Sequence, residues 1–389
     1  MKKRPVSAAT KAAFAIAGVL ALTQAAWADD VTYRFSGFGT LGVAKTDQDG
    51  TEFRQNVDQY NGADKSLDLG VDSRIALQGT AAYKDFAFTG QLLGNRRLGE
   101  EFKVGFEWIY AQYTGVPGLD LKLGRVALPA FLVSDSRRVG YAVPWLRVPT
   151  LVYAMMPLSN VDGGQATYRH SIGSAILSGQ VTSGNAKTKF GSTQAGVNLG
   201  PPFGVVYPNS DTDIQTRDIL AFNAMLEWGD WTARLSQVKG DVNFAATATL
   251  PFGQVTRVLF FEDTFQEAGL QYDNGQVVVV AEYVKRKTDP MVQTADAWYV
   301  GGGYRFGSVM PYAVVSRYKT KEQLDTPVLP PDATGLALGV RWDLAANLAL
   351  KGEWAQYKNS GPYAFTNAAT PDVANKKINV LSVALDFVF

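Results

Sequence analysis

Alternation of apolar and polar residues is the dominant pattern of this sequence. Across residues 67–77 the odd positions are mostly apolar, whereas the even positions are polar or small. The same period of two recurs over residues 231–236, 336–344 and 348–354. This is the pattern of a β-strand that has one apolar and one polar face. The chain is therefore predicted to be all-β.

Short and long connections alternate between the predicted strands. Seven short turns are expected, and Asp273-Asn274-Gly275 is a favourable hairpin turn among them. The eight long connections are expected at about residues 46–66, 94–101, 129–163, 183–216, 241–260, 288–295, 320–333 and 359–375. These connections separate 16 strands. An even number of strands leaves both ends of the sheet on the side of the short turns, as in single-chain outer-membrane barrels.

A soluble sandwich or propeller is the alternative, because single strands of a sandwich show the same alternation. No fixed repeat indicates propeller blades. Charged residues lie within the predicted strands on the non-apolar face: Asp68, Asp72, Arg74, Glu282, Arg341, Lys351 and Glu353. A sheet can cross the hydrocarbon part of a membrane only if it closes into a barrel, because an open sheet leaves unpaired edges there. We therefore predict a transmembrane antiparallel β-barrel of about 16 strands.

The first 28 residues have the three parts of a secretory signal peptide. A basic start is followed by a short apolar run and by Ala26-Trp27-Ala28, which predicts cleavage between Ala28 and Asp29. The apolar run is too short for a membrane-spanning helix. Residues 29–389 are then expected to form the barrel as a single domain.

Composition narrows the function classes. Removal of residues 1–28 takes away four basic residues and leaves 33 basic against 36 acidic residues, which argues against a nucleic-acid partner. Cysteine is absent, so disulfides, thiolate metal sites and a cysteine nucleophile are excluded. The single histidine, His170, lies beside a predicted short turn, and the glycines at 301–303 are not followed by a helix. We expect no catalytic residues, no metal site and no cofactor.

The chain resembles Gram-negative outer-membrane porins in three places. Its opening stretch, Tyr33-Arg34-Phe35-Ser36-Gly37-Phe38-Gly39-Thr40-Leu41-Gly42, resembles the first strand of porins, and Leu123-Gly124-Arg125 is similar to the start of their third extracellular loop. Alternating apolar residues that end on Phe389 resemble the C-terminal signal which the barrel-assembly machinery recognises. The resemblance implies a multi-pass protein of the Gram-negative outer membrane that contacts lipid, a third loop folded into the lumen, and a homotrimer.

The region after Gly124 departs from the best-studied diffusion porins. Their third loop carries a Pro-Glu-Phe-Gly-Gly type motif with an acidic cluster, whereas this chain has Ser134-Asp135-Ser136-Arg137-Arg138. Their cation preference therefore does not carry over.

The predicted pore constriction combines loop residues with residues of the barrel wall. Charged groups in a narrow lumen act on passing ions with little screening. The loop candidates are Asp135, Arg137, Arg138, Tyr141 and Arg147, and the wall candidates are Arg34, Arg74, Arg234 and Arg341. Alternatively, the loop arginines pair with carboxylates such as Asp162 and only hold the loop in place. Tyr141, Trp145 and Tyr153 are expected to pack, or else to form a surface along which a flat or sugar-like solute slides.

These features predict a porin that forms a water-filled channel for passive diffusion of small hydrophilic solutes or ions, with a possible preference for anions. A solute-specific channel is the alternative, and a non-channel barrel, such as an adhesin or a barrel enzyme, is a third hypothesis.

Overall fold

The computed structural model describes residues 31–48, 52–56, 58–59, 62–97, 100–193, 197–198, 205–206, 209–250, 253–288, 294–322, 332–358, 365–366 and 377–389. The predicted signal peptide, with Ala28 and Asp29, lies outside the described residues. Among the described residues there is no helix of the length and apolarity that a membrane span needs.

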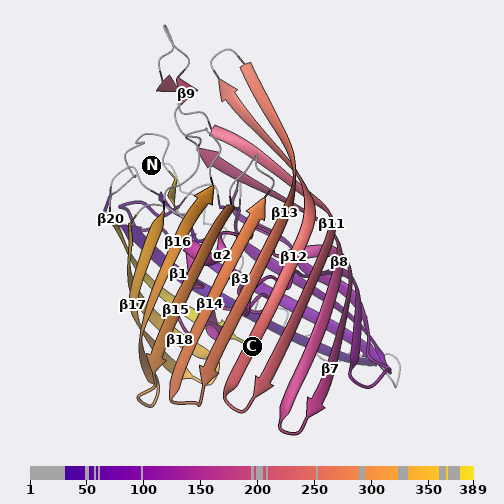
Figure 1. Ribbon diagram of the computed structural model, residues 1–389. Coiled ribbons are helices and arrows are strands. Elements are labelled where there is room, and N and C mark those ends of the chain that lie inside the picture. Colours follow the sequence, from indigo (N-terminus) through magenta and orange to yellow (C-terminus); the bar gives the residue numbers. More distant parts are fainter. Residues whose placement is uncertain are drawn as a thin grey trace, which may run out of the picture.

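Sixteen antiparallel strands form one closed barrel, in which each strand pairs with its neighbours along the chain (Figure 1). The barrel strands are β1 (Val31–Thr46), β3 (Arg74–Tyr83), β4 (Phe86–Arg97), β5 (Glu100–Tyr113), β6 (Leu119–Ala127), β7 (Asn160–Ile172), β8 (Ala175–Thr193), β11 (Asn209–Trp228), β12 (Trp231–Leu250), β13 (Gly253–Asp273), β14 (Val277–Thr288), β15 (Thr294–Tyr304), β16 (Val309–Glu322), β17 (Ala333–Ala345), β18 (Leu348–Lys358) and β20 (Lys377–Val388). The predicted barrel and its number of strands are confirmed.

Shorter elements lie in the long connections. They are β2 (Glu52–Phe53), which pairs with β19 (Phe365–Thr366), β9 (Val197–Asn198), which pairs with β10 (Val205–Val206), a 3-10 helix η1 (Gly140–Ala142) and a one-turn helix α2 (Thr150–Tyr153).

The first and last strands close the barrel. β1 and β20 pair from Phe38 opposite Val388 to Thr46 opposite Val380. Phe389 continues this contact, since its backbone N–H and carbonyl both bond to Gly37. Closure leaves the barrel sheet without an unpaired edge.

The period of two separates an outward face from an inward face in the barrel strands. Leu336, Leu338, Val340 and Trp342 on β17 are exposed outward, as the alternation predicts. Large outward aromatic residues lie near the short turns, where Trp231 packs against Tyr272 at 4.7 Å between ring centres. Exposed apolar side chains with aromatic residues near the strand ends are what a lipid-facing surface requires.

Several strand boundaries differ from the prediction. The alternating stretch at residues 67–73 is not a barrel strand: the Asp68 carboxylate accepts bonds from the backbone N–H of Gly70 and Val71, both at 2.8 Å, and turns the chain before β3 begins. The long connection expected at residues 94–101 is shorter, because β4 continues to Arg97 and β5 begins at Glu100.

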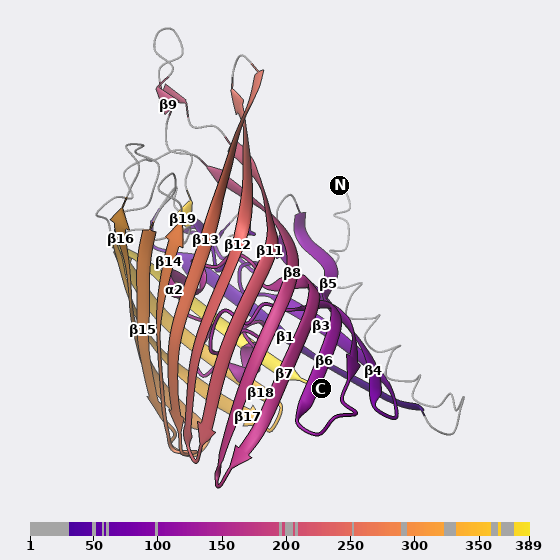
Figure 2. The ribbon, with the colours of Figure 1, turned by 45° about the vertical axis from the view of Figure 1, so that its right-hand side comes forward.

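The long connections expected at residues 183–216 and 241–260 are largely strand. β8, β11, β12 and β13 continue past the rest of the barrel and pair with one another, which gives the tall hairpins at the top of Figure 2. Val242 and Phe261, which pair directly at the base of these hairpins, pack in a small apolar cluster with Ala154. Mutual pairing of the strands keeps the backbone in strand geometry beyond the barrel.

Candidate functional site

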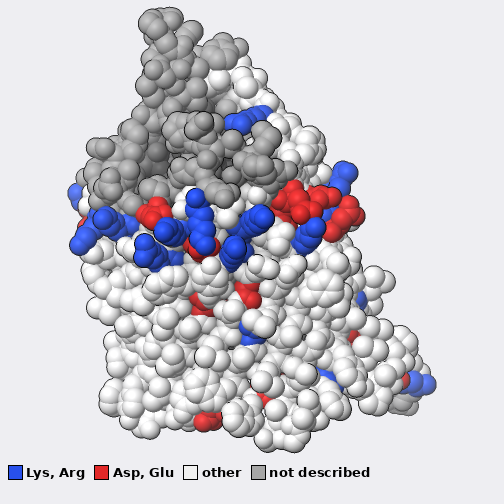
Figure 3. Space-filling view, viewed as in Figure 1, with Lys and Arg blue, Asp and Glu red and all other residues white. Residues whose placement is uncertain are grey.

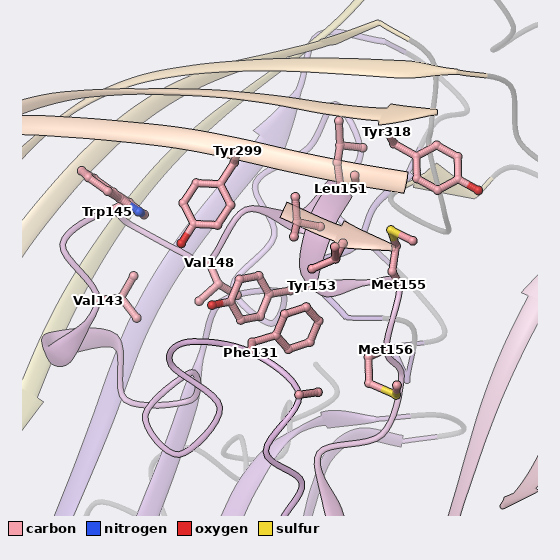
Figure 4. Close-up of a cluster of buried hydrophobic side chains, with 14 of the residues drawn as sticks. Phe131, Val143, Trp145, Val148, Leu151, Tyr153, Met155, Met156, Tyr299 and Tyr318 are labelled. Atoms are coloured by element: carbon pink, nitrogen blue, oxygen red, sulfur yellow. The ribbon is translucent and has the colours of Figure 1, made fainter. Parts of the chain in front are cut away.

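The connection between β6 and β7, residues 128–159, folds into the barrel; we call it the lumen loop. It contains η1 and α2, and many of its apolar side chains are buried (Figure 4). Phe131 and Leu151 are 0% exposed, and Trp145 is 2% exposed. The loop is thus a packed element of the lumen, and it lies between the fifth and sixth barrel strands as predicted.

An apolar stripe on the inward face of β13–β18 seats the lumen loop. The Phe131 ring stacks on Tyr153 at 4.1 Å and meets Phe265 edge-on at 5.2 Å. Trp145 packs against Tyr312 at 5.5 Å. The buried rings of Trp145 and Tyr153 therefore pack against the wall and are not a free surface for solute.

Glycine on β15 makes room for Trp145. A Cβ atom at Gly301 would lie 2.5 Å from the Trp145 indole ring. Gly301 therefore has a packing role.

Lys351 on β18 is the most extensively bonded anchor of the lumen loop. Its ammonium donates to the carbonyls of Gly140, Val143 and Trp145 at 2.7, 2.7 and 2.9 Å. It also pairs with Asp386 at 3.0 Å, and both side chains are 0% exposed. Charged donors make hydrogen bonds that are stronger than those between neutral groups. One lysine thus fixes three successive parts of the loop to the wall.

Arg147 anchors the same half of the loop to β20 and to the turn that precedes β3. Its guanidinium donates to both carboxylate oxygens of Asp72, at 3.1 and 2.8 Å, and to the Ser382 hydroxyl at 2.5 Å. Burial alone lowers the pKa of Arg147, but the charges of Asp72 and Glu353 outweigh it and raise the pKa overall. Arg147 is 4% exposed, so it fits the alternative that a loop arginine holds the loop.

Glu282 on β14 anchors the part of the lumen loop that contains Leu132 and Tyr153. Its carboxylate accepts bonds from the hydroxyls of Tyr153 and Tyr299, at 2.5 and 2.7 Å, and from the backbone N–H of Leu132 at 2.9 Å. Burial, with the charge of Glu282, raises the pKa of Tyr153 well above its ordinary value. The phenol therefore keeps its proton and acts as the donor.

Several predicted constriction residues contact the loop from the wall. Arg341 donates to the carbonyls of Tyr141 and Val143, at 2.8 and 3.2 Å, and its guanidinium lies 4.8 Å from the Tyr141 ring centre. The Tyr141 hydroxyl donates to the Ala346 carbonyl at 2.7 Å. Arg234 lies 3.4 Å from the Leu132 carbonyl. Contacts of this kind position the loop.

Three other sequence candidates lie apart from these anchors. Arg34 is exposed and pairs in register with Thr80, close to a short turn and away from the loop. Asp135 is exposed on the loop, and among the described residues it forms no ion pair. Asp162 pairs with Arg125, at 2.6 Å, and not with a loop arginine as the alternative proposed.

Arg74, Arg137 and Arg138 come together at a small cavity that Asp58 also lines; we call them the arginine cluster. Arg138 lies 3.9 Å from both Asp58 and Glu107, and Arg97 lies 3.8 Å from Glu107. Arg137 donates to the Leu158 carbonyl at 3.1 Å. Burial, and to a lesser extent the neighbouring Arg138, lowers the pKa of Arg137 to about 10. Its guanidinium is therefore still charged at neutral pH.

The wall of β3–β8 and β11 bears paired neutral side chains on its inward face. The pairs are Thr80 with Thr89 at 3.0 Å, Gln91 with Gln78 at 2.9 Å, Gln165 with Thr182 at 3.1 Å, Gln180 with Thr167 at 3.1 Å, and Asn223 with Gln180. The loop anchors lie mainly on β12–β20, so this amide and hydroxyl wall borders the remaining lumen. The half-buried members of these pairs, Gln78, Thr80, Gln180 and Asn223, offer donors and acceptors to water and to hydrophilic solutes.

Sequence reasoning did not assign roles to Lys351, Glu282, Asp72 or Asp386. The first three were recognised as charges on the non-apolar face, which is a usable signal. A charge that faces inward in a strand needs a partner if the lumen is filled.

The sequence matches the model of the Gram-negative porin family over residues 12–362. The chain belongs to the Gram-negative porins. No curated protein matches the sequence. This porin therefore lies in the outer membrane, and its family and fold support a diffusion channel rather than an enzyme.

Solved structures share the fold of this porin. It is similar to OmpT of Vibrio cholerae in its trimer form, with a TM-score of 0.59 and 14% identity over 93% of this chain and 100% of that one. It is also similar to an anion-selective porin from Comamonas acidovorans, with a TM-score of 0.54 and 15% identity over 92% and 100% of the two chains. The outer-membrane channel DcaP of Acinetobacter baumannii gives a TM-score of 0.58 and 11% identity over 95% and 100%.

Proposed function

We propose that this porin lets small hydrophilic solutes diffuse passively down their gradients, with a preference for anions. The arginine cluster carries the proposal. The cluster supplies three guanidinium groups and the neighbouring Arg97 a fourth. Arg138 lies near the carboxylates of Asp58 and Glu107, and Asp135 adds a third carboxylate on the same loop. The excess charge is positive.

The chemistry of the cluster also favours anions. The Nε atoms of Arg74 and Arg138 are buried and have no hydrogen-bond partner among the described residues. The carboxylates lie at 3.8–3.9 Å and leave the arginines without a short, bidentate partner. These guanidinium groups therefore keep a positive charge that no short ion pair among the described residues offsets, and this charge favours a passing anion. Screening by solvent is weak at a constriction, so a small excess of charge acts strongly.

Reversal potential across a salt gradient tests this proposal. With the pure porin in a planar bilayer, we expect the sign of the reversal potential to show that anions pass more readily than cations. Replacing Arg137 and Arg138 by Ala should move it toward cations, while Arg34→Ala, a lumen arginine away from the loop, should change it little. A cation-selective wild-type channel, or a double variant identical to the wild type, would contradict the role of the cluster.

A solute-specific channel is the second candidate, and the paired amide and hydroxyl side chains of β3–β8 and β11 favour it. These pairs suit a polyhydroxylated solute, which exchanges hydrogen bonds with water for similar bonds to the wall. A specific channel shows concentration-dependent block of conductance by its solute, whereas a general porin does not. Absence of conductance steps would exclude both channels and leave an adhesin or another non-channel barrel.

We also propose a homotrimer that the barrel-assembly machinery inserts through its C-terminal strand. The trimer form of Vibrio cholerae OmpT supports the first point. The exposed Phe389, stacked on Phe387 at 6.3 Å between ring centres, supports the second. Crosslinking in native membranes tests the trimer, and Phe389→Ser should lower the amount of assembled barrel.

A further inference from the structure

A cavity of about 230 Å³ lies between the lumen loop and the inward face of β13–β17. Val143 and Trp145 line it from the loop, and Tyr299 lines it from the wall; all three are labelled in Figure 4. It shares only Val148 with the cavity of the arginine cluster. The docked loop therefore leaves a second, separate space between itself and the wall.

The short turns border one end of this cavity. Arg305 and Asp343 both line it. The backbone N–H of Arg305 donates to the Gln276 carbonyl, and that of Asp343 donates to the Ser308 carbonyl, both at 2.8 Å. Gln276 and Ser308 lie in the turns that follow β13 and β15. The cavity thus lies on the short-turn side of the lumen loop.

Buried apolar side chains form part of the cavity lining. Val143, Val280 and Met310 all line it, and each is less than 5% exposed. An apolar cavity of about 150 Å³ is large enough to hold benzene. A volume of 230 Å³ therefore has room for an aromatic ring or a branched alkyl group together with a short polar end.

Two cations and two anions line the same cavity: Arg305, Arg341, Asp273 and Asp343. Arg305 donates to both carboxylate oxygens of Asp273, at 2.6 and 2.8 Å. Arg341 donates through Nε to Asp343 at 2.8 Å. By contrast, the outward face in Figure 3 is mostly white toward the short turns. The cavity therefore offers charges of both signs, and these charges balance.

These ion pairs leave groups that a ligand can reach. The side chains of Arg305, Asp273 and Asp343 are 29%, 30% and 33% exposed. Ion pairs as accessible as these contribute little to stability, so exchanging one partner for a ligand costs little. Among the described residues, Asp343 accepts a side-chain bond through Oδ1 alone, and Nε of Arg305 donates to none. One acceptor and one donor thus remain for a ligand.

We propose that this cavity binds a small zwitterion with an apolar body, the chemistry of an α-amino acid with an aromatic or branched side chain. The carboxylate of the ligand pairs with Arg305, and its ammonium pairs with Asp343. The apolar body lies against Val143, Val280 and Met310. A ligand with a single charge would meet an uncompensated like charge, whereas a zwitterion matches both signs. This site goes beyond the proposed function, which rests on the arginine cluster.

Equilibrium dialysis with radiolabelled ligands tests the proposal on the full-length mature porin in detergent, and protein-free micelles correct for partitioning. The probe is L-phenylalanine. Three analogues each lack one part of it: 3-phenylpropanoate lacks the ammonium, 2-phenylethylammonium lacks the carboxylate, and glycine lacks the ring. Each analogue should bind at least about tenfold more weakly, because it loses a charged hydrogen bond or the burial of the ring.

Two substitutions separate the roles of the charges. Asp343→Asn should weaken L-phenylalanine and 2-phenylethylammonium about tenfold and should not weaken 3-phenylpropanoate. Arg305→Gln should weaken L-phenylalanine and 3-phenylpropanoate about tenfold and should not weaken 2-phenylethylammonium. Arg34→Gln is the matched control, because Arg34 also lies close to a short turn but away from the loop, and it should leave all affinities unchanged. Gln271→Phe, which places a ring in the cavity, should weaken all three ring compounds.

Three results would overturn the proposal. Equal affinity for L-phenylalanine and its two singly charged analogues would indicate that the ring alone is bound. Glycine that binds as tightly as L-phenylalanine would show that the apolar lining is not used. Equal loss of all ligands in both charge variants would indicate general damage to the cavity, and heat-modifiable gel mobility checks that each variant is folded.

The outcome is distinguishable from that of the proposed function. Dialysis reports binding in the absence of a salt gradient, and the charges around this cavity balance. A cation-selective reversal potential would contradict the role of the arginine cluster and leave the zwitterion site in place. Loss of the preference for L-phenylalanine would remove this site and leave anion preference untouched.

Discussion

Lys351→Met is expected to release the half of the lumen loop that contains Gly140, Val143 and Trp145. Methionine keeps most of the side-chain volume but removes the three donors to loop carbonyls and the partner of Asp386. Asp386 then keeps the Thr40 hydroxyl, which donates to it at 2.5 Å, but it has lost its charge partner in a fully buried site.

The size of the effect follows from these contacts. Removing one member of a buried ion pair costs about 3–5 kcal/mol, because the remaining charge is left uncompensated. A hydrogen bond to a charged group contributes about 1.5–3 kcal/mol, and three carbonyls lose theirs. The barrel ladder is untouched, so most of the loss should fall on docking of the loop. An undocked fraction should rise by at least about 100-fold, since about 1.4 kcal/mol is a factor of ten.

Single-channel recording and limited proteolysis report the undocked state. We expect frequent transitions between conductance levels and trypsin cleavage after Arg137 or Arg138, which are sheltered in the wild type. Lys122→Met is the control, because Lys122 faces inward on β6, pairs in register with Gln165 and lies over the Tyr110 ring without contacting the loop. The double variant Lys351→Met, Asp386→Leu should recover part of the lost stability, since both charges are then absent. Steady conductance and trypsin resistance in Lys351→Met would refute the anchoring role.

Two further substitutions address the packing and the other anchor. Gly301→Val places its Cβ against the Trp145 ring and should destabilise loop docking by about 1–3 kcal/mol, seen as noisier conductance; unchanged recordings would show that the ring has room to move. Tyr153→Phe removes a donor to Glu282 and should lower the thermal unfolding midpoint, since a buried acceptor that loses a partner costs about 1–3 kcal/mol. Because the raised pKa of Tyr153 keeps the phenol protonated in the folded state, its contribution is full below pH 10 and is lost as pH rises further. Stability of Tyr153→Phe should therefore fall less steeply than that of the wild type above pH 10, and parallel curves would contradict this.

Period-two alternation was sufficient to predict the barrel, because lipid outside and polar lumen inside impose opposite demands on successive residues. The position of the lumen loop, between the fifth and sixth barrel strands, followed from counting the short and long connections. The extension of β12 and β13 above the barrel was missed. The sequence there is rich in Thr and Ala and lacks clear alternation, and the two strands are held by pairing with each other. The turn at Asp68 was missed because its local hydrogen bonds compete with strand pairing.

Roles of the arginines could not be predicted from sequence. Arg147 and Arg138 are nine residues apart on the loop, yet the first is held by both oxygens of Asp72 and the second lies 3.9 Å from its carboxylates. The difference depends on which wall residues each part of the loop meets, more than 200 positions away in the case of Ser382. The partners of Lys351 could not be predicted either, because they are backbone carbonyls and every residue carries one.

The contacts of Lys351 bear on the order of assembly. Asp386 lies on the last strand, and its bonding partner Thr40 lies opposite it on the first, so the lysine meets the loop beside the seam where the barrel closes. Until β18 and β20 have been synthesised and β20 has paired with β1, the loop lacks Lys351, which holds Gly140 and Val143, and Ser382, which is one of the partners of Arg147. Docking of this half of the loop is thereby tied to closure of the barrel, and a barrel left open at this seam would leave the half around Gly140 and Val143 undocked.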